Sequence, residues 1–136
     1  VYASVIADGI HVDYATIRIA KQLMGERLFL ITDAVTEDLR GEYPFRFNAD
    51  RNRFEDESGT LSGSALTMLD AVRNCVHHVG IPIDEALRMA STVPARLVGL
   101  GHRLGRIAPG YEASWVVLDD ALEVRGVVER GRLEGF

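Results

Sequence analysis

The sequence has a single cysteine, Cys75, and no apolar run near the roughly 20 residues that a membrane-spanning helix requires. One cysteine cannot form an internal disulfide, which is typical of proteins from a reducing compartment. No signal peptide precedes the first predicted strand. These absences predict a cytoplasmic protein that does not enter a membrane.

Basic residues are also too few and too scattered for a nucleic-acid surface. The chain of 136 residues carries 15 Lys and Arg against 20 Asp and Glu, a net charge of −5, and phosphate contacts need clustered cations. The 47% hydrophobic and 26% charged residues are close to the globular average and argue against disorder. Because the chain lacks an initiator Met and opens inside a predicted strand, we expect it to be part of a longer polypeptide.

Motifs for a complete metal site are missing as well. No pair of residues has the His-x-His, His-Glu-x-x-His or Cys-x-x-Cys spacing. His77 and His78 come late in a predicted helix and His102 lies in a glycine-flanked loop, so we interpret all three as structural. Cys75 falls within the same amphipathic helix, with no base nearby, and is interpreted as a packed or partly exposed thiol.

A strand, a helix and a second strand open the chain. Residues 1–7 are of strand type, Asp13 can cap a helix that ends at Gly25, and residues 27–32 form a nearly continuous apolar run. Such runs are typical of parallel sheets covered on both faces. The fold class is therefore α/β, and the remaining strands of the sheet are expected upstream of Val1.

The middle of the chain predicts a hairpin and then a long helix. The segment "YPFRFNADRNRF" alternates as a hairpin does, with its turn at about 49–52. Apolar residues from Ala65 to Val79 have helical spacing, with Ser62 or Ser64 as the cap and Gly80 as the terminator.

The end of the chain predicts short helices and a small β-unit. A helix over 84–91 follows Pro82, and Pro94 is expected to open a further turn that runs to Leu97. The segments "ASWVVLD", "EVRGVVE" and "GRLEGF" predict three strands, with turns at Asp119-Asp120 and Arg130-Gly131.

His11 and Asp33 each follow an apolar strand, one strand-helix repeat apart. The carboxyl ends of parallel strands carry the active sites of barrels and open α/β sheets. An imidazole there can polarise a carbonyl while a carboxylate moves protons. The alternative is that Asp33 caps a loop and His11 bonds to a turn, and spacing alone leaves both open.

Residues 60–67, "TLSGSALT", place small side chains and backbone N–H groups at a predicted helix start. Such a segment can receive an anion or a sugar hydroxyl. Ordinary helix capping explains the same pattern, and the sequence does not decide between the two.

Five blocks taken in order, "IADGIHVDY", "LFLITDAV", "GTLSGSALTMLDAVRN", "ALRMASTVPARLVGL" and "LGRIAPGYEASWVVLD", resemble the C-terminal part of the N-acetylglucosamine-6-phosphate deacetylase family of the amidohydrolase superfamily. The resemblance covers nearly the whole chain except a divergent stretch at about 36–56. It implies a (β/α)8 TIM barrel whose last two strands are residues 1–7 and 27–32. It also implies a barrel portion over 1–107 and a share of a small β-sandwich over 108–136.

The resemblance also implies roles for individual residues. Asp33 would be the catalytic residue, taking a proton from a metal-bound water and returning it to the departing amine, while His11 helps to polarise the acetamide carbonyl. Leu61, Ser62 and Gly63 match the segment that lines the sugar site. The substrate is then N-acetylglucosamine 6-phosphate, and the products are glucosamine 6-phosphate and acetate.

Part of the implied machinery lies outside this sequence. In the family a divalent metal, zinc or iron, is held by a Glu and two His upstream of Val1, and Asp33 would be a ligand only if the parent site held a second ion. The isolated chain is therefore expected to be inactive, and the parent enzyme to be a homodimer. The alternatives are another amidohydrolase, acting on a cyclic amide or a different acylated amino sugar, and a non-catalytic fragment that exchanges strands with a second copy. Ser114-Trp115 stands where the family usually shows Asp-Leu.

Overall fold

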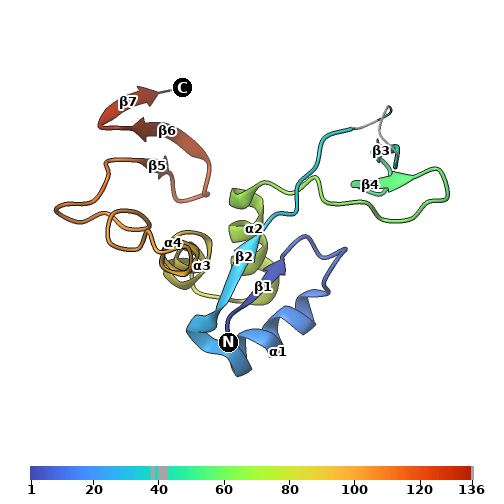
Figure 1. Cartoon of the computed structure of the whole chain (residues 1–136), viewed down its shortest axis with the longest axis horizontal. Coiled ribbons are helices and arrows are strands. Elements are labelled where there is room, and N and C mark those ends of the chain that lie inside the picture. The colour runs from blue at the N-terminus through green and yellow to red at the C-terminus, as the bar shows by residue number, and fades with distance from the viewer. Residues whose placement is uncertain (38, 40–42, 136) are drawn as a thin grey trace. The chain divides into compact units, whose positions relative to one another are not determined.

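A computed structural model describes residues 1–37, 39 and 43–135, which form two compact units, Val1–Ala90 and Ser91–Phe136 (Figure 1). The predicted insert at about 36–56 includes residues 38 and 40–42, which lie outside the described residues. No helix in the described part of the chain is both long and apolar enough to cross a membrane.

The first unit is built on a parallel pair of strands. Strands β1 (Ala3–Ile6) and β2 (Leu28–Ile31) pair in register from Ala3 with Leu28 to Ile6 with Ile31. Helix α1 (Tyr14–Met24) and a short 3₁₀ turn η1 (Gly25–Arg27) connect them. The predicted strand-helix-strand unit is confirmed.

Helix α1 begins and ends at the residues that the sequence predicts. The Asp13 carboxylate accepts a hydrogen bond from the Ala15 N–H at 2.8 Å, and Gly25 ends the helix with a φ of 58°. This positive φ is strained for other residues, which is why a glycine stands there.

One face of the parallel pair is more deeply buried than the other. Leu28 and Leu30 are 2% and 1% exposed, whereas the alternate residues Phe29 and Ile31 are only partly buried. Helices α1, α2 (Met68–Asn74) and α3 (Ile83–Ala90) all contact β2. The described residues therefore cover one face of this sheet more completely than the other.

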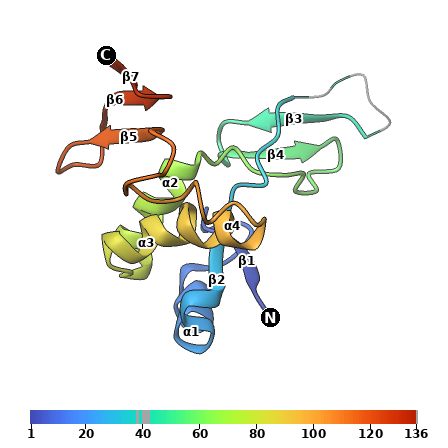
Figure 2. The same cartoon turned by 60° about the vertical axis from the view of Figure 1, so that its left-hand side comes forward.

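The hairpin prediction is confirmed. Strands β3 (Phe45–Asn48) and β4 (Arg53–Asp56) pair antiparallel, so that the turn falls at residues 49–52 (Figure 2). Phe54 is the buried side chain of this hairpin and contacts the rings of Phe45 and Phe47.

The predicted start of the long helix was wrong. Helix α2 begins at Met68, and its cap is Thr67, whose hydroxyl accepts from the Asp70 N–H at 3.1 Å. Ser62 and Ser64 do not cap it, because Ser64 is buried in another set of hydrogen bonds described below. The helix continues as a π-helical turn η2 (Cys75–Val79) and ends at Gly80, the predicted terminator. Cys75 is fully buried, and burial raises the pKa of its thiol to about 11.

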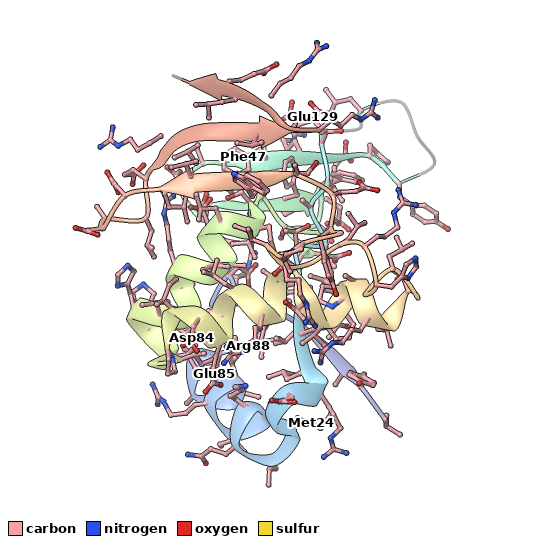
Figure 3. The ribbon with its side chains drawn as sticks, turned by 90° about the vertical axis from the view of Figure 1, so that its left-hand side faces the viewer. Met24, Phe47, Asp84, Glu85, Arg88 and Glu129 are labelled. Atoms are coloured by element: carbon pink, nitrogen blue, oxygen red, sulfur yellow. The ribbon has the colours of Figure 1, made fainter. Side chains whose placement is uncertain are left out.

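Helix α3 matches the prediction within a residue and carries three charged side chains. Figure 3 shows Asp84, Glu85 and Arg88 projecting from it, and Arg88 pairs with Asp84 at 2.9 Å.

The second unit contains α4 (Thr92–Leu97) and a three-stranded antiparallel sheet. Pro94 is the third residue of α4 rather than the first, so the predicted opening was two residues late. Proline is tolerated there because N–H groups in the first turn have no helical partner.

The three predicted C-terminal strands are confirmed as β5 (Trp115–Leu118), β6 (Val124–Glu129) and β7 (Arg132–Gly135). Arg130 and Gly131 both have positive φ, which suits a tight hairpin turn.

Candidate functional site

The loops that follow β1 and β2 lie at the same edge of the parallel pair. Ile6 is the register partner of Ile31, and continuing that register by two residues sets Asp8 opposite Asp33. His11 lies on the first loop and Asp33 on the second. The structure thus brings the two predicted residues to one sheet edge, as the parallel arrangement requires.

His11 is held by Asp8, a residue to which the sequence analysis assigned no role. The His11 Nδ1 lies 2.6 Å from one carboxylate oxygen of Asp8, and the two side chains are 16% and 10% exposed. The other carboxylate oxygen accepts the N–H groups of Ile10 and His11, both at 2.9 Å. Both carboxylate oxygens of Asp8 therefore accept hydrogen bonds from this loop.

Asp8 is stabilised as a carboxylate by these contacts. Burial alone would raise its pKa, but the hydrogen bonds from the His11 ring and from the backbone N–H groups of Ile10 and His11 outweigh burial and lower it. A negative charge therefore stays beside the His11 ring at neutral pH.

Residues of α1 and α2 pack against the loop after β1. Asn74 of α2 donates to the carbonyl oxygen of Ala7 at 2.8 Å. The Tyr14 ring stacks on His78 at 4.9 Å, and a Cβ added at Gly9 would meet that ring at 2.7 Å. Gly9 is thus required by both its φ of 74° and this close approach.

Asp33 occupies a strained backbone conformation on the second loop. Its φ is 51°, a left-handed value that is uncommon for residues other than glycine. Its side chain is exposed, while its carbonyl oxygen accepts the Ser64 N–H at 2.9 Å. The carboxylate is presented to solvent from a loop that is fixed by backbone bonds.

Ser64 holds the Asp33 loop on both sides. Its hydroxyl donates to the carbonyl oxygen of Thr32 and accepts the Leu66 N–H at 3.1 Å, and its own carbonyl accepts the Val35 N–H at 3.1 Å. At 1% exposed it is the buried polar residue of the described core. The local sequence indicates Ser64 only as a candidate cap, and no local pattern reveals a bond across 32 residues.

The predicted sugar-site segment lies next to Asp33. Ser62 donates its N–H to the Phe54 carbonyl at 2.9 Å, and Leu61 bridges to Glu55 of β4. A Cβ added at Gly63 would lie 2.6 Å from Val35. The backbone N–H groups of Ser62 and Ser64 are therefore occupied, and the expected free helix-start N–H groups are not found at these two positions. The side chains of this segment remain the candidates for contact with a ligand.

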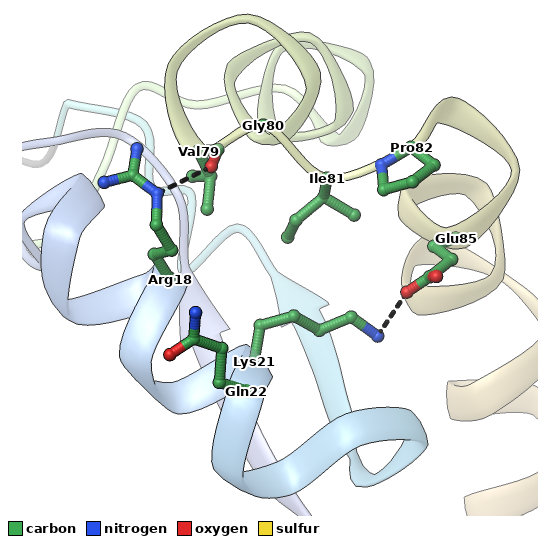
Figure 4. A pocket seen from close by; sticks show the side chains of 8 residues that line it. All are labelled: Arg18, Lys21, Gln22, Val79, Gly80, Ile81, Pro82 and Glu85. Atoms are coloured by element: carbon green, nitrogen blue, oxygen red, sulfur yellow. Dashed lines mark hydrogen bonds and ion pairs between the residues drawn. The ribbon is translucent and has the colours of Figure 1, made fainter.

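A separate pocket of about 310 Å³ lies between α1 and the turn that precedes α3 (Figure 4). Arg18 donates to the carbonyls of Val79 and His78, each at 3.0 Å, and Lys21 pairs with Glu85 at 2.8 Å. The charged groups of this pocket are thus engaged with one another and with carbonyls. It shares no residue with the loops that carry His11 and Asp33.

The described residues do not form a complete metal centre. Among positions 1–37, 39 and 43–135, no three His, Cys, Asp or Glu side chains gather as metal ligands. His11 and Asp33 lie on two separate loops at the same edge of the parallel pair.

Comparison with known proteins places this geometry in context. The sequence pattern of the amidohydrolase family matches residues 3–133. The N-acetylglucosamine-6-phosphate deacetylase of Haemophilus influenzae is 33% identical over 97% of this chain and 36% of its own length. A putative N-acetylgalactosamine-6-phosphate deacetylase of Escherichia coli is 35% identical over 99% of this chain and 84% of its own length.

A solved structure gives the same result for the fold. The crystal structure of N-acetylglucosamine-6-phosphate deacetylase from Pasteurella multocida superposes with a TM-score of 0.92 and 34% identity, over all of this chain and 37% of that one. The chain thus spans about a third of the length of the Haemophilus influenzae and Pasteurella multocida deacetylases.

Proposed function

Because this chain belongs to the amidohydrolase family, we propose that it is the C-terminal portion of an enzyme that hydrolyses N-acetylglucosamine 6-phosphate to glucosamine 6-phosphate and acetate. The observation that carries this proposal is the match, over the whole chain and at a TM-score of 0.92, to a deacetylase of that specificity. The placement of His11 and Asp33 at one sheet edge supports it.

In this proposal β1 and β2 are the last two strands of a (β/α)8 TIM barrel. The partly buried face of the pair, with Phe29 and Ile31, would then be the one completed by the rest of the enzyme. Residues 1–107 would belong to the barrel and residues 108–136 to a small β-sandwich. Both assignments rest on the likeness to proteins about three times as long.

Asp33 is proposed as the catalytic acid and base. Its exposed carboxylate would take a proton from the water that attacks the acetamide carbonyl, and would return that proton to the amine nitrogen as the C–N bond breaks. The fixed backbone around Asp33 supports this role, because proton transfer requires a carboxylate within hydrogen-bond reach of both atoms in turn.

His11, Leu61, Ser62 and Gly63 are proposed to bind the substrate. His11 would do so through Nε2, the ring nitrogen that Asp8 leaves open. The ligands of a divalent metal, zinc or iron, would come from the rest of the enzyme, with Asp33 as a further ligand only if two ions were bound. We further propose that the enzyme is cytoplasmic and that it is a homodimer. Light scattering of the complete protein would test the dimer.

A second substrate is favoured by one observation. The Escherichia coli relative, of which this chain covers 84%, is described as a putative N-acetylgalactosamine-6-phosphate deacetylase. The two sugars differ only at one hydroxyl-bearing carbon, and the reaction is the same. The rates at which the complete protein releases acetate from each of the two sugar phosphates decide between them. Release from neither would reject the proposed function.

The catalytic assignment has its own test. Asp33→Asn in the complete protein should lower kcat by about 10²- to 10⁴-fold, because the amide cannot accept and return a proton. Asp84→Asn, an exposed carboxylate on α3 that pairs with Arg88, serves as the matched control and should change kcat little. Normal turnover by Asp33→Asn would exclude Asp33 as the acid and base.

A further inference from the structure

We propose that Asp8 is a positioning residue that fixes the His11 ring with its proton on Nδ1, so that Nε2 is the ring nitrogen offered to a ligand. This inference deepens the proposed function and rests on it for the identity of that ligand, an acylated amino-sugar phosphate. The tautomer itself is a property of this chain and can be measured without any substrate.

The contact geometry gives the direction of the hydrogen bond. The Asp8 oxygen lies 2.6 Å from the Nδ1 of His11. A carboxylate only accepts hydrogen bonds, so Nδ1 must be the donor and carry a proton. In a neutral imidazole the second nitrogen, Nε2, then has a free lone pair, and in the protonated ring both nitrogens are donors.

The rest of the loop leaves the carboxylate no other orientation. Its second oxygen accepts the N–H groups of Ile10 and His11 at 2.9 Å each. Rotation of the Asp8 side chain would break both bonds together with the bond to the ring. The Ala7 carbonyl just before it accepts a hydrogen bond from Asn74 at 2.8 Å, and Gly9 just after it leaves no room for a Cβ beside the Tyr14 ring. The His11 ring is therefore oriented by Asp8, and Asp8 is in turn oriented by the backbone of its own loop.

The same geometry predicts what an amide would do at this position. In Asp8→Asn the carbonyl oxygen can keep both backbone N–H groups, which places the NH₂ group toward Nδ1. Nδ1 must then accept, and the proton of the neutral ring moves to Nε2. A single isosteric change thus reverses the hydrogen-bonding role of the nitrogen that faces the ligand, as is known for the buried Asp of serine-protease triads.

The first experiment measures the tautomer by NMR in the complete protein, labelled with ¹⁵N at histidine and without substrate. The His11 signal is identified by its loss in His11→Asn. The wild-type ring should give the pattern of a protonated Nδ1, and Asp8→Asn the pattern of a protonated Nε2. A wild-type ring protonated on Nε2 alone, or one with both tautomers in exchange, would overturn the proposal.

The second experiment measures kinetics on N-acetylglucosamine 6-phosphate. Asp8→Asn should lower kcat/KM at least tenfold, because it removes the charge that holds the ring and turns Nε2 from an acceptor for a sugar hydroxyl into a donor. Asp13→Asn is the matched control: it makes the same change five residues along, at the exposed cap of α1, whose carboxylate contacts the Ala15 N–H and not His11. Its kcat/KM should stay within about twofold of wild type. Equal effects of the two substitutions would overturn the positioning role even if the tautomer is as expected.

The two experiments separate the inference from the proposed function. If the wild-type protein releases no acetate from this sugar, the deacetylase assignment fails, while the NMR pattern still confirms or refutes the role of Asp8. If wild type is active and the tautomer does not change in Asp8→Asn, the deacetylase assignment stands and the role of Asp8 is refuted.

Discussion

Replacement of Ser64 by alanine tests whether the loop that carries Asp33 is positioned by a buried hydroxyl. The substitution removes the hydrogen bond to the Thr32 carbonyl and leaves the Leu66 N–H without its acceptor. A hydrogen bond contributes about 1 kcal/mol net, and a buried N–H without a partner costs about 1–3 kcal/mol. We therefore expect Ser64→Ala to lower the free energy of unfolding by about 2–3 kcal/mol.

Loss of stability alone would not show that Ser64 positions Asp33. Asp33 holds a left-handed φ of 51°, and such residues persist only where the surrounding bonds fix them. Once the Thr32 carbonyl is released, the loop can relax toward ordinary conformations and move the carboxylate. Displacements of about 1 Å in an active site cost up to about 100-fold in rate, so kcat should fall about 10- to 100-fold.

The matched control is Val72→Ala in α2. Val72 is 2% exposed in the same core, and its apolar side chain cannot hydrogen-bond to the Asp33 loop. Truncation of its side chain should cost about 2 kcal/mol, comparable with the loss in Ser64→Ala. Denaturant unfolding of both variants would establish that match, and kcat should fall only in Ser64→Ala.

Amide hydrogen exchange supplies a local measurement. The Val35 N–H donates to the Ser64 carbonyl at 3.1 Å, and its exchange should accelerate in Ser64→Ala but not in Val72→Ala. If the two variants had equal turnover, or if Val35 were equally protected in both, the positioning of Asp33 by Ser64 would be refuted.

Two further predictions follow from the same loops. Gly63→Ala should destabilise the protein by clearly more than Gly59→Ala, since both glycines have positive φ but only Gly63 has a neighbour, Val35, at 2.6 Å; the Gly59 change should cost about 1–2 kcal/mol, and equal unfolding midpoints would contradict the contact. Acid should destabilise the Asp8 loop: a carboxyl whose pKa is lowered on folding contributes stability that is present above its ordinary value of 3.8 and lost as the pH falls through the lower folded pKa. Asp8→Asn should therefore flatten the loss of stability on acidification, measured by thermal unfolding from pH 6 downward, and an unchanged profile would contradict it.

Local sequence patterns were sufficient for the elements that are defined by their own residues. The start of α1 at Asp13 and its end at Gly25 follow from a carboxylate cap and a glycine with positive φ, both of which act within one turn. The hairpin of β3 and β4 follows from alternation over a dozen residues. The order of the five sequence blocks was enough to indicate the family.

Tertiary structure decided which residue caps α2, because several residues before the helix have the local features of a cap. Ser62, Ser64 and Thr67 all precede the long helix, and any of them can cap in isolation. Ser64 instead lies buried against Thr32, because the alternative would leave the Thr32 carbonyl and the buried Leu66 N–H without these partners. The helix consequently begins at Met68, capped by Thr67.

In the candidate site, too, the sequence predicts some features and the fold determines others. The sequence by itself determined that His11 and Asp33 each follow an apolar strand, and parallel pairing then carried both to one edge. It did not determine that Asp8 holds the ring of His11 or that Ser64 holds the backbone of Asp33. Those contacts depend on the fold of a loop and on a bond across 32 residues. Such bonds form only once the core has excluded water from the groups that make them.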